Sequence, residues 1–267
     1  MLKTNQKDWE YWKDELTKEI KKLGAKYDTW HVFNDFITMV AIAISNGAIK
    51  LHFAEREKQY MDIINKYDPV AQQQFAVMNK YLINALECTL PEYRDVLGDV
   101  CQELSLTNKD LSQDFTPYCM SKVIAEVLSE DSLRIIAEEG FLKLSEPTVG
   151  GGSIVLAYAE CLAREHSNPR GSICITAVDI SFKCVCMAYI QLSYYGIPAV
   201  VIYGDTILVK EYSRWYTPEY LWGDWLWRCK CGLTDGFKAD DEALKQMSVP
   251  FYRAARIVDN LWNMREI

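Results

Sequence analysis

Apolar residues recur at helical spacing through the first hundred residues of the chain. The pattern predicts one helix from Trp9 to Leu23 and a second that begins after Asp28 or Thr29 and ends at Asn46-Gly47. The apolar face of the second helix comprises Phe33, Phe36, Ile37, Val40 and Ile44. Glycine is sparse and β-branched runs are absent, so residues 1–110 are predicted to form a helical N-terminal domain.

Three further helices are predicted within this region. The helical period continues over Phe53–Tyr67, and Asp68-Pro69 begins a helix that runs to about Cys88. Pro91 stands at a position typical of the first turn of a helix, which would continue through Glu103.

The second half of the chain changes to an alternation of strands and helices. Thr116-Pro117 predicts a helix over Tyr118–Leu128, with threonine as its cap and proline at its first position, and Asp131 caps a short helix after it. The elements predicted next are strand Phe141–Ser145, helix Ser153–His166, strand Ser172–Val178, helix Phe182–Tyr195 and strand Ala199–Tyr203. This order predicts an α/β fold with a mostly parallel, doubly wound sheet over residues 111–267.

Each predicted strand delivers a carboxylate to the same edge of this sheet. Glu146 and a loop containing Gly150-Gly151-Gly152 follow the first strand, Asp179 follows the second, and Asp205 follows the third. Ligands of such sheets bind at the carboxyl ends of the strands, and glycines allow the backbone to approach them closely. An acid after the second strand suits ribose hydroxyls, and one after the third suits the amine of adenine. Two simpler interpretations stay open: the glycines form only a tight turn, and Asp179 only caps the helix that begins near Ser181.

Composition narrows the class of protein. The formal net charge of −8 argues against a chain that binds nucleic acid alone, because neutralising phosphates requires clustered Lys and Arg. The nine cysteines include Cys184/Cys186 and Cys229/Cys231, which lack the two-residue spacing of a zinc knuckle, so no metal site is expected. The segment Phe36–Ala48 is the most apolar and is too short to cross a bilayer, and no signal peptide is recognised, so a cytoplasmic protein without membrane contact is expected.

Four ordered motifs resemble those of the N6-adenine-specific DNA methyltransferases. Asp114-Phe115-Thr116-Pro117-Tyr118 resembles the Phe-Tyr/Phe-Thr-Pro motif of that family, and Glu146–Gly152 resembles its Asp/Glu-Pro-x-x-Gly-Ser/Thr-Gly loop. Asp179 and Gly204-Asp205-Thr206 match its two acidic motifs. The runs Val96–Leu104 and Phe33–Phe36 resemble the methylase subunit of type I restriction-modification enzymes, and the similarity covers residues 28 to about 210.

The resemblance implies a Rossmann-like domain that binds S-adenosylmethionine. By that resemblance, Thr116 and Pro117 lie by the methionyl group, and Glu146, Gly150 and Gly152 form the loop under the ligand. Asp179 holds the ribose and Asp205 the adenine amine. The implied cofactor-binding residues also include Phe115, Thr148, Ile180 and Thr206.

The family's catalytic tetrapeptide, Asn/Asp-Pro-Pro-Tyr/Phe, is missing from the sequence. Asn168-Pro169-Arg170 precedes the second strand, and Thr217-Pro218-Glu219-Tyr220 lacks the amide and the second proline, with no apolar strand predicted before it. In that family the tetrapeptide holds the amine of the flipped target base. The catalytic residues are therefore left unknown.

An aromatic segment follows the third strand where the tetrapeptide would be expected. Its aromatic residues are Trp215, Tyr216, Tyr220, Trp222, Trp225 and Trp227. Such residues stack on bases in some proteins and more often pack in a core. The tail from Asp240 to Ile267 has an amphipathic helical pattern interrupted at Pro250, which would close the sheet or contact a partner.

Three functions are compatible with this sequence. The first is an S-adenosylmethionine-binding relative of the family, catalytically degenerate or dependent on a partner, in a restriction-related or mobile-element system. The second is an active DNA adenine N6-methyltransferase, and the third is a methyltransferase that uses the aromatic segment on another substrate. The chain has no room for a target-recognition domain, so DNA would be contacted through a partner specificity subunit, in a homo- or hetero-oligomer.

Overall fold

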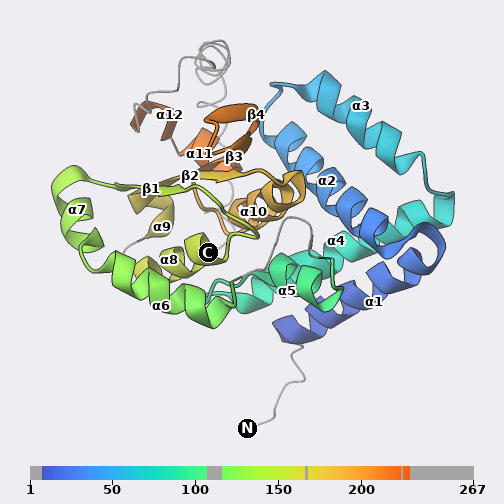
Figure 1. Ribbon diagram of the computed structural model, residues 1–267, viewed down its shortest axis with the longest axis horizontal. Helices are drawn as coiled ribbons and strands as arrows, with labels where there is room; N and C mark the ends of the chain where they lie inside the picture. The colour runs from blue at the N-terminus through green and yellow to red at the C-terminus, as the bar shows by residue number, and fades with distance from the viewer. Residues whose placement is uncertain (1–7, 107–115, 166–167, 224, 229–267) are drawn as a thin grey trace, which may run out of the picture.

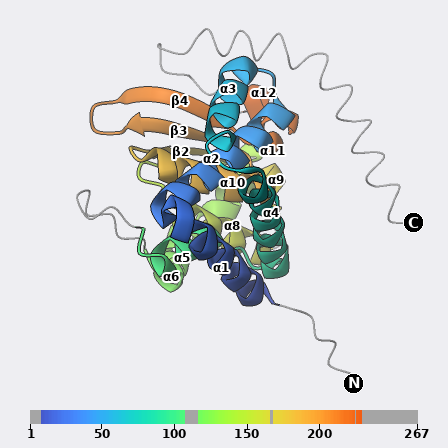
Figure 2. The ribbon, with the colours of Figure 1, turned by 90° about the vertical axis from the view of Figure 1, so that its right-hand side faces the viewer.

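The computed structural model describes residues 8–106, 116–165, 168–223 and 225–228. Its N-terminal part is helical, as predicted, and comprises α1 (Trp9–Tyr27), α2 (Thr29–Ala48), α3 (Phe53–Ile64), α4 (Pro69–Thr89) and α5 (Val96–Glu103). In this part α1 packs along both α2 and α4 (Figures 1 and 2). Within the described ranges, no helix combines the length and hydrophobicity that a membrane span requires.

The start of α5 differs from the prediction. The helix begins at Val96 rather than near Pro91, because Asp95 is its N-cap and its carboxylate accepts a hydrogen bond from Gly98 N at 2.8 Å. The predicted start rested on Pro91, whereas the signal that matches the observed start is Asp95 followed three residues later by Gly98.

The sheet has four strands in the order β1-β2-β3-β4. The strands are β1 (Leu142–Glu146), β2 (Ile173–Asp179), β3 (Ala199–Asp205) and β4 (Lys210–Tyr216). The first three are parallel, and β4 runs antiparallel to β3. The prediction of an α/β fold, with a helical N-terminal region and a mostly parallel sheet, is confirmed. The sheet is not doubly wound within the described residues, because the strand order is sequential and both crossover helices lie on the same face.

Helices cover both faces of this sheet (Figure 1). The helices α8 (Ser153–Arg164) and α10 (Phe182–Tyr194) lie on one face, and α6 (Tyr118–Ser129) packs against α8. The short helices on the other face are α11 (Pro218–Trp222) and α12 (Trp225–Arg228). The connecting helices are α7 (Ser132–Glu139), between α6 and β1, and α9 (Pro169–Ser172), before β2.

Two predicted helix caps need correction. Pro117, not Thr116, is the N-cap of α6, because its backbone is extended, with φ −54° and ψ 137°. Asp131 does occupy the N-cap position of α7, but its side chain makes no capping hydrogen bond.

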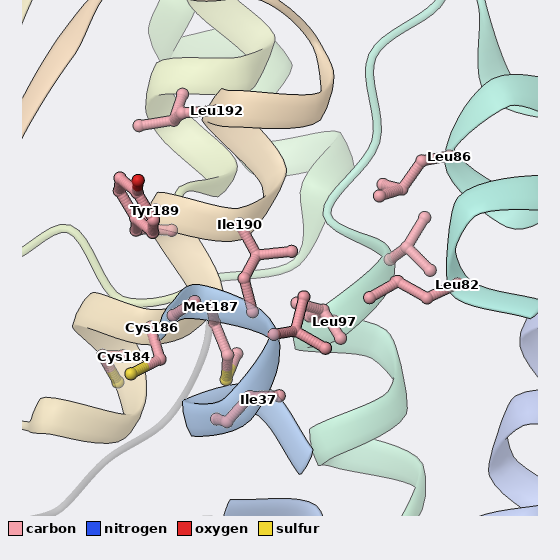
Figure 3. Close-up of a cluster of buried hydrophobic side chains, with 14 of the residues drawn as sticks. Ile37, Leu82, Leu86, Leu97, Cys184, Cys186, Met187, Tyr189, Ile190 and Leu192 are labelled. Atoms are coloured by element: carbon pink, nitrogen blue, oxygen red, sulfur yellow. The ribbon is translucent and has the colours of Figure 1, made fainter. Parts of the chain in front are cut away.

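One buried cluster joins the helical region to the α/β part. Figure 3 shows side chains of α2, α4 and α5, including Ile37, Leu82 and Leu97, directed toward α10. The cluster extends from Leu16 to Trp215, so the helices and the inner face of the sheet share a core. A domain boundary at residue 110 stays a prediction.

The aromatic segment is mainly part of the core. Trp215, Tyr216, Tyr220 and Trp225 are at most 3% exposed, whereas Trp222 is 48% exposed. Tyr216, Tyr220 and Trp225 pack on the outer face of the sheet, where the Trp225 ring meets Phe141 edge to face. The packing interpretation is therefore confirmed for these four residues. The side chain of Trp227 and the tail 229–267 lie outside the described residues.

Candidate functional site

Glu146, Asp179 and Asp205 are the last residues of β1, β2 and β3. Because these strands are parallel and adjacent, the three carboxylates lie along one edge of the sheet. The predicted strand ends are thus confirmed, with each strand extended by one or two residues so that it includes its acid. Residues from three separate sequence regions are brought together at a position where α/β sheets bind ligands.

The glycine loop is fixed to the end of β2. Val149 N donates to Val178 O at 2.9 Å, and Gly150 N donates to Asp179 Oδ2 at 2.9 Å. Gly150 and Gly152 have φ values of +55° and +100°, which favour glycine, and α8 begins directly after them at Ser153. The loop therefore holds one defined shape, with its backbone close to the strand ends.

Asp179 is a buried acid with a structural task. It is 8% exposed, and its second oxygen, Oδ1, accepts a hydrogen bond from Ser181 N at 2.7 Å. Burial raises its pKa, and the two backbone donors oppose that change. The interpretation of Asp179 as a helix cap is wrong, because Ser181 is the N-cap of α10 and Asp179 instead closes the turn that precedes the helix. Each carboxylate oxygen has two lone pairs, so capacity for a ligand hydroxyl remains.

The turn between β3 and β4 lies next to the loop that follows β1. Asp205 Oδ1 accepts hydrogen bonds from Ile207 N and Leu208 N, each at 2.9 Å, so this acid shapes the hairpin. Thr206 Oγ1 donates to Pro147 O at 2.7 Å, which joins the hairpin to the loop after β1. Ile180, 54% exposed, presents an apolar side chain at the end of β2.

Glu146 orders the first part of the glycine loop. Its Oε1 accepts hydrogen bonds from the backbone N–H of Thr148 at 3.0 Å and from the Thr148 hydroxyl at 3.3 Å. Glu146 is half-buried and Thr148 is exposed, so both border open space at the sheet edge.

The Thr-Pro segment lies beside the loop through a helix contact. Ser121 in the first turn of α6 donates to Ser153 Oγ, the first residue of α8, at 3.1 Å. Thr116 and Pro117 precede that turn and are exposed. Phe115 lies outside the described residues, so its predicted place at the methionyl end is not observed.

A buried pair below the loop was missed from the sequence. Gln191 Nε2 on α10 donates to Asp95 Oδ1 at 2.8 Å and to Gly151 O at 2.7 Å. Leu97 N donates in turn to Gln191 Oε1 at 3.0 Å. The only local signal is the Asp95-x-x-Gly98 spacing of a helix cap, because Gln191 is 96 residues away in the chain.

Thr217-Pro218 lies at the opposite edge of the sheet from the three acids. The strand β4, which was not predicted, precedes it. It is antiparallel, so its end pairs with the beginning of β3. Thr217 Oγ1 donates to Ile197 O and accepts from Ala199 N, both at 2.9 Å. Thr217 caps α11 and cannot act on a ligand held beside Asp179.

The residues present fit a nucleoside ligand of the S-adenosylmethionine type. The glycines let the loop backbone pack closely on its neighbours, since a Cβ on Gly151 would lie 2.6 Å from the Asp95 carboxylate and one on Gly152 would lie 3.7 Å from Ala188. Acids suited to ribose and adenine contacts stand at the neighbouring strand ends. Among the described residues, no group of three or more His, Cys, Asp or Glu side chains is arranged to hold a metal ion.

Comparisons with known proteins add little to this site. No family model and no curated protein matches the sequence. Among solved structures, the chain is similar to a candidate class I S-adenosylmethionine-dependent methyltransferase from Listeria monocytogenes, with 10% identity and a TM-score of 0.33. The similarity covers 73% of this chain and 55% of that protein. It is too weak to support a conclusion about fold or activity.

Proposed function

We propose that this chain binds S-adenosylmethionine at the carboxyl edge of its parallel strands. The observation that carries the proposal is the hydrogen bond from Gly150 N to Asp179 Oδ2, which unites a glycine loop and a strand-end acid in one site. Asp205 lies at the next strand end, on the side where the adenine would bind. Ligands of parallel α/β sheets bind at the carboxyl ends of the strands, where glycines allow the backbone to approach them closely.

The chain by itself lacks the residues that would position an adenine amine for methyl transfer. The sequence has no Asn/Asp-Pro-Pro-Tyr/Phe tetrapeptide, and the nearest substitute, Thr217-Pro218, is at the wrong edge. We therefore place the protein among catalytically degenerate or partner-dependent relatives of the N6-adenine DNA methyltransferases. Because the net charge is −8, we propose that DNA is contacted through a partner specificity subunit rather than by this chain.

The second candidate function is an active DNA adenine N6-methyltransferase. The ordered motifs from Thr116-Pro117 to Gly204-Asp205-Thr206 favour it. The two functions differ in one measurable step, the appearance of labelled methyl groups on DNA.

Isothermal titration calorimetry tests the binding site. We expect the wild-type chain to bind S-adenosylmethionine and Asp179→Ala to bind it at least tenfold more weakly, because the substitution removes both the ribose acceptor and the anchor of Gly150. Asp62→Ala is the matched control, since Asp62 is an exposed aspartate on α3. If the wild-type chain shows no heat of binding at millimolar S-adenosylmethionine, the proposal is refuted.

Methyl transfer from labelled cofactor to DNA separates the two candidates. The chain alone should leave DNA unlabelled. Incorporation that persists through purification and is lost in Asp205→Ala would establish the active enzyme instead. Co-purification from the native host, followed by the same assay on the complex, tests partner dependence.

A further inference from the structure

Asp95 is a buried carboxylate placed directly under the glycine loop. It is 5% exposed, and its Oδ1 accepts hydrogen bonds from Gly98 N and Gln191 Nε2, both at 2.8 Å. Its other oxygen lies so close to Gly151 that a Cβ on that glycine would be 2.6 Å away. The carboxylate therefore packs directly against the backbone of the glycine loop.

The groups around Asp95 do not neutralise it. Its titratable neighbours on α5 are Asp99 and Cys101, and Tyr195, the residue directly after α10, also interacts with it. Lys13 and Arg94 interact with Asp99 rather than with Asp95. Among the described residues, no lysine or arginine forms an ion pair with Asp95.

An ionised carboxylate at this buried position destabilises the fold. Burial raises the pKa of Asp95 to about 6, with the hydrogen bonds from Gln191 and Gly98 lowering it in part. At pH 7.5 the carboxylate is thus largely ionised, and its charge is confined to a poorly solvated place. Strongly perturbed acids in such positions are candidates for functional use.

We propose that the Asp95 carboxylate makes the glycine-loop site selective for a positively charged ligand. S-adenosylmethionine carries a sulfonium charge, whereas its demethylated product, S-adenosylhomocysteine, is a neutral thioether. A negative charge behind the loop attracts the sulfonium of S-adenosylmethionine and has little effect on the binding of the neutral thioether. This selectivity rests on the proposed binding function and goes beyond it, since it identifies the residue that would distinguish cofactor from product.

The size of the effect follows from Coulomb's law. As a scale, opposite unit charges separated by about 10 Å at an effective dielectric constant near 20 change a dissociation constant by roughly tenfold or somewhat more. Gln191 fixes the position of the Asp95 carboxylate relative to the loop, since its amide donates hydrogen bonds to both that carboxylate and the Gly151 carbonyl. Asp95 and Gln191 are therefore positioning residues, which reach a ligand only through the loop.

Dissociation constants for the two ligands, measured by calorimetry, test the inference. The ratio of Kd for S-adenosylhomocysteine to Kd for S-adenosylmethionine should fall roughly tenfold in Asp95→Asn relative to wild type, with product affinity little changed. Asp99→Asn removes a charge one turn along the same helix and should leave the ratio near the wild-type value. An unchanged ratio in Asp95→Asn would overturn the inference.

A pH series on the wild-type chain gives a second test that does not depend on a variant folding. Between pH 7.5 and pH 5 the wild-type ratio should fall toward that of Asp95→Asn, because protonation removes the same charge. A wild-type ratio that is constant over this range contradicts the inference while leaving the binding site intact. Failure of both ligands to bind the wild-type chain would instead refute the proposed function, and the selectivity with it.

Discussion

Replacing Asp95 with asparagine should stabilise the protein at neutral pH. The carboxyl has its pKa raised from 3.8 to about 6 in the folded chain. Each unit corresponds to about 1.4 kcal/mol, so keeping the carboxylate ionised costs the fold about 3 kcal/mol above pH 6. For an acid whose pKa rises on folding, stability is highest below the unfolded value and is lost as pH increases through the folded value.

Asparagine can keep the two hydrogen bonds that Oδ1 accepts, from Gly98 N and Gln191 Nε2. Its new amide N–H groups would occupy the crowded side next to Gly151, and a buried donor without a partner costs about 1 kcal/mol or more. The net gain in the free energy of unfolding should therefore be about 2 kcal/mol at pH 7.5 and should disappear near pH 4.

Urea unfolding at pH 7.5, 6 and 4 measures this difference directly. Asp62→Asn on the exposed face of α3 serves as a control for general charge effects. An Asp95→Asn protein that is less stable than wild type at pH 7.5, or a difference that does not change with pH, would refute this account of the buried acid. A gain in stability together with a loss of ligand selectivity is the outcome expected of a functional site.

Four further substitutions test other parts of the structure by urea unfolding at pH 7.5. Gly151→Ala should destabilise the protein by about 1–3 kcal/mol, because its Cβ meets a buried carboxylate, whereas Gly47→Ala, with open space around it in α2, should stabilise it by up to about 1 kcal/mol. Equal changes in the free energy of unfolding for these two variants would contradict the close approach of the Asp95 carboxylate to Gly151. Thr217→Val should cost about 1–3 kcal/mol through its lost buried hydrogen bonds yet leave ligand affinity unchanged, and a large loss of affinity would show that the sheet edges are wrongly assigned. Arg56→Met should cost about 2–4 kcal/mol, because the guanidinium donates to Arg214 O at 2.7 Å and stacks 4.0 Å over a buried tryptophan; a neutral result would contradict that role.

The strand-end acids were predictable because several local signals agree. Apolar runs of strand length end at Glu146, Asp179 and Asp205. Proline and glycine follow the first run and precede the second and third, which separates each run from a helical pattern. Parallel pairing then follows from the helices between them. No tertiary information was needed to place these three residues on one edge.

The hairpin after the third strand was missed because its pattern is weak. The strand β4 carries Lys210, Glu211 and Arg214 among its seven residues, and its polarity conceals a strand that is buried only at its end. The antiparallel direction of β4 was nevertheless implied by the length of its connection to β3. Only four residues separate it from β3, which suffices for a hairpin and is too few for a parallel crossover.

The buried acid below the loop could not be identified from local sequence. Asp95 resembles an ordinary helix cap, and its burial depends on Gln191, 96 residues along the chain, and on the backbone of Gly151. Such a network exists only after the helical region packs against α10. Long-range packing decides which of many aspartates acquires a perturbed pKa.

The central claim, that a cofactor binds along the glycine loop, is tested most directly by titrating the isotope-labelled chain with S-adenosylmethionine and following backbone amide resonances. We expect saturable shifts that are largest at Gly150, Gly151 and Gly152, with further shifts at Asp179 and Ile180. Saturable shifts confined to residues distant from this edge of the sheet, or the absence of any shift at millimolar ligand, would contradict it.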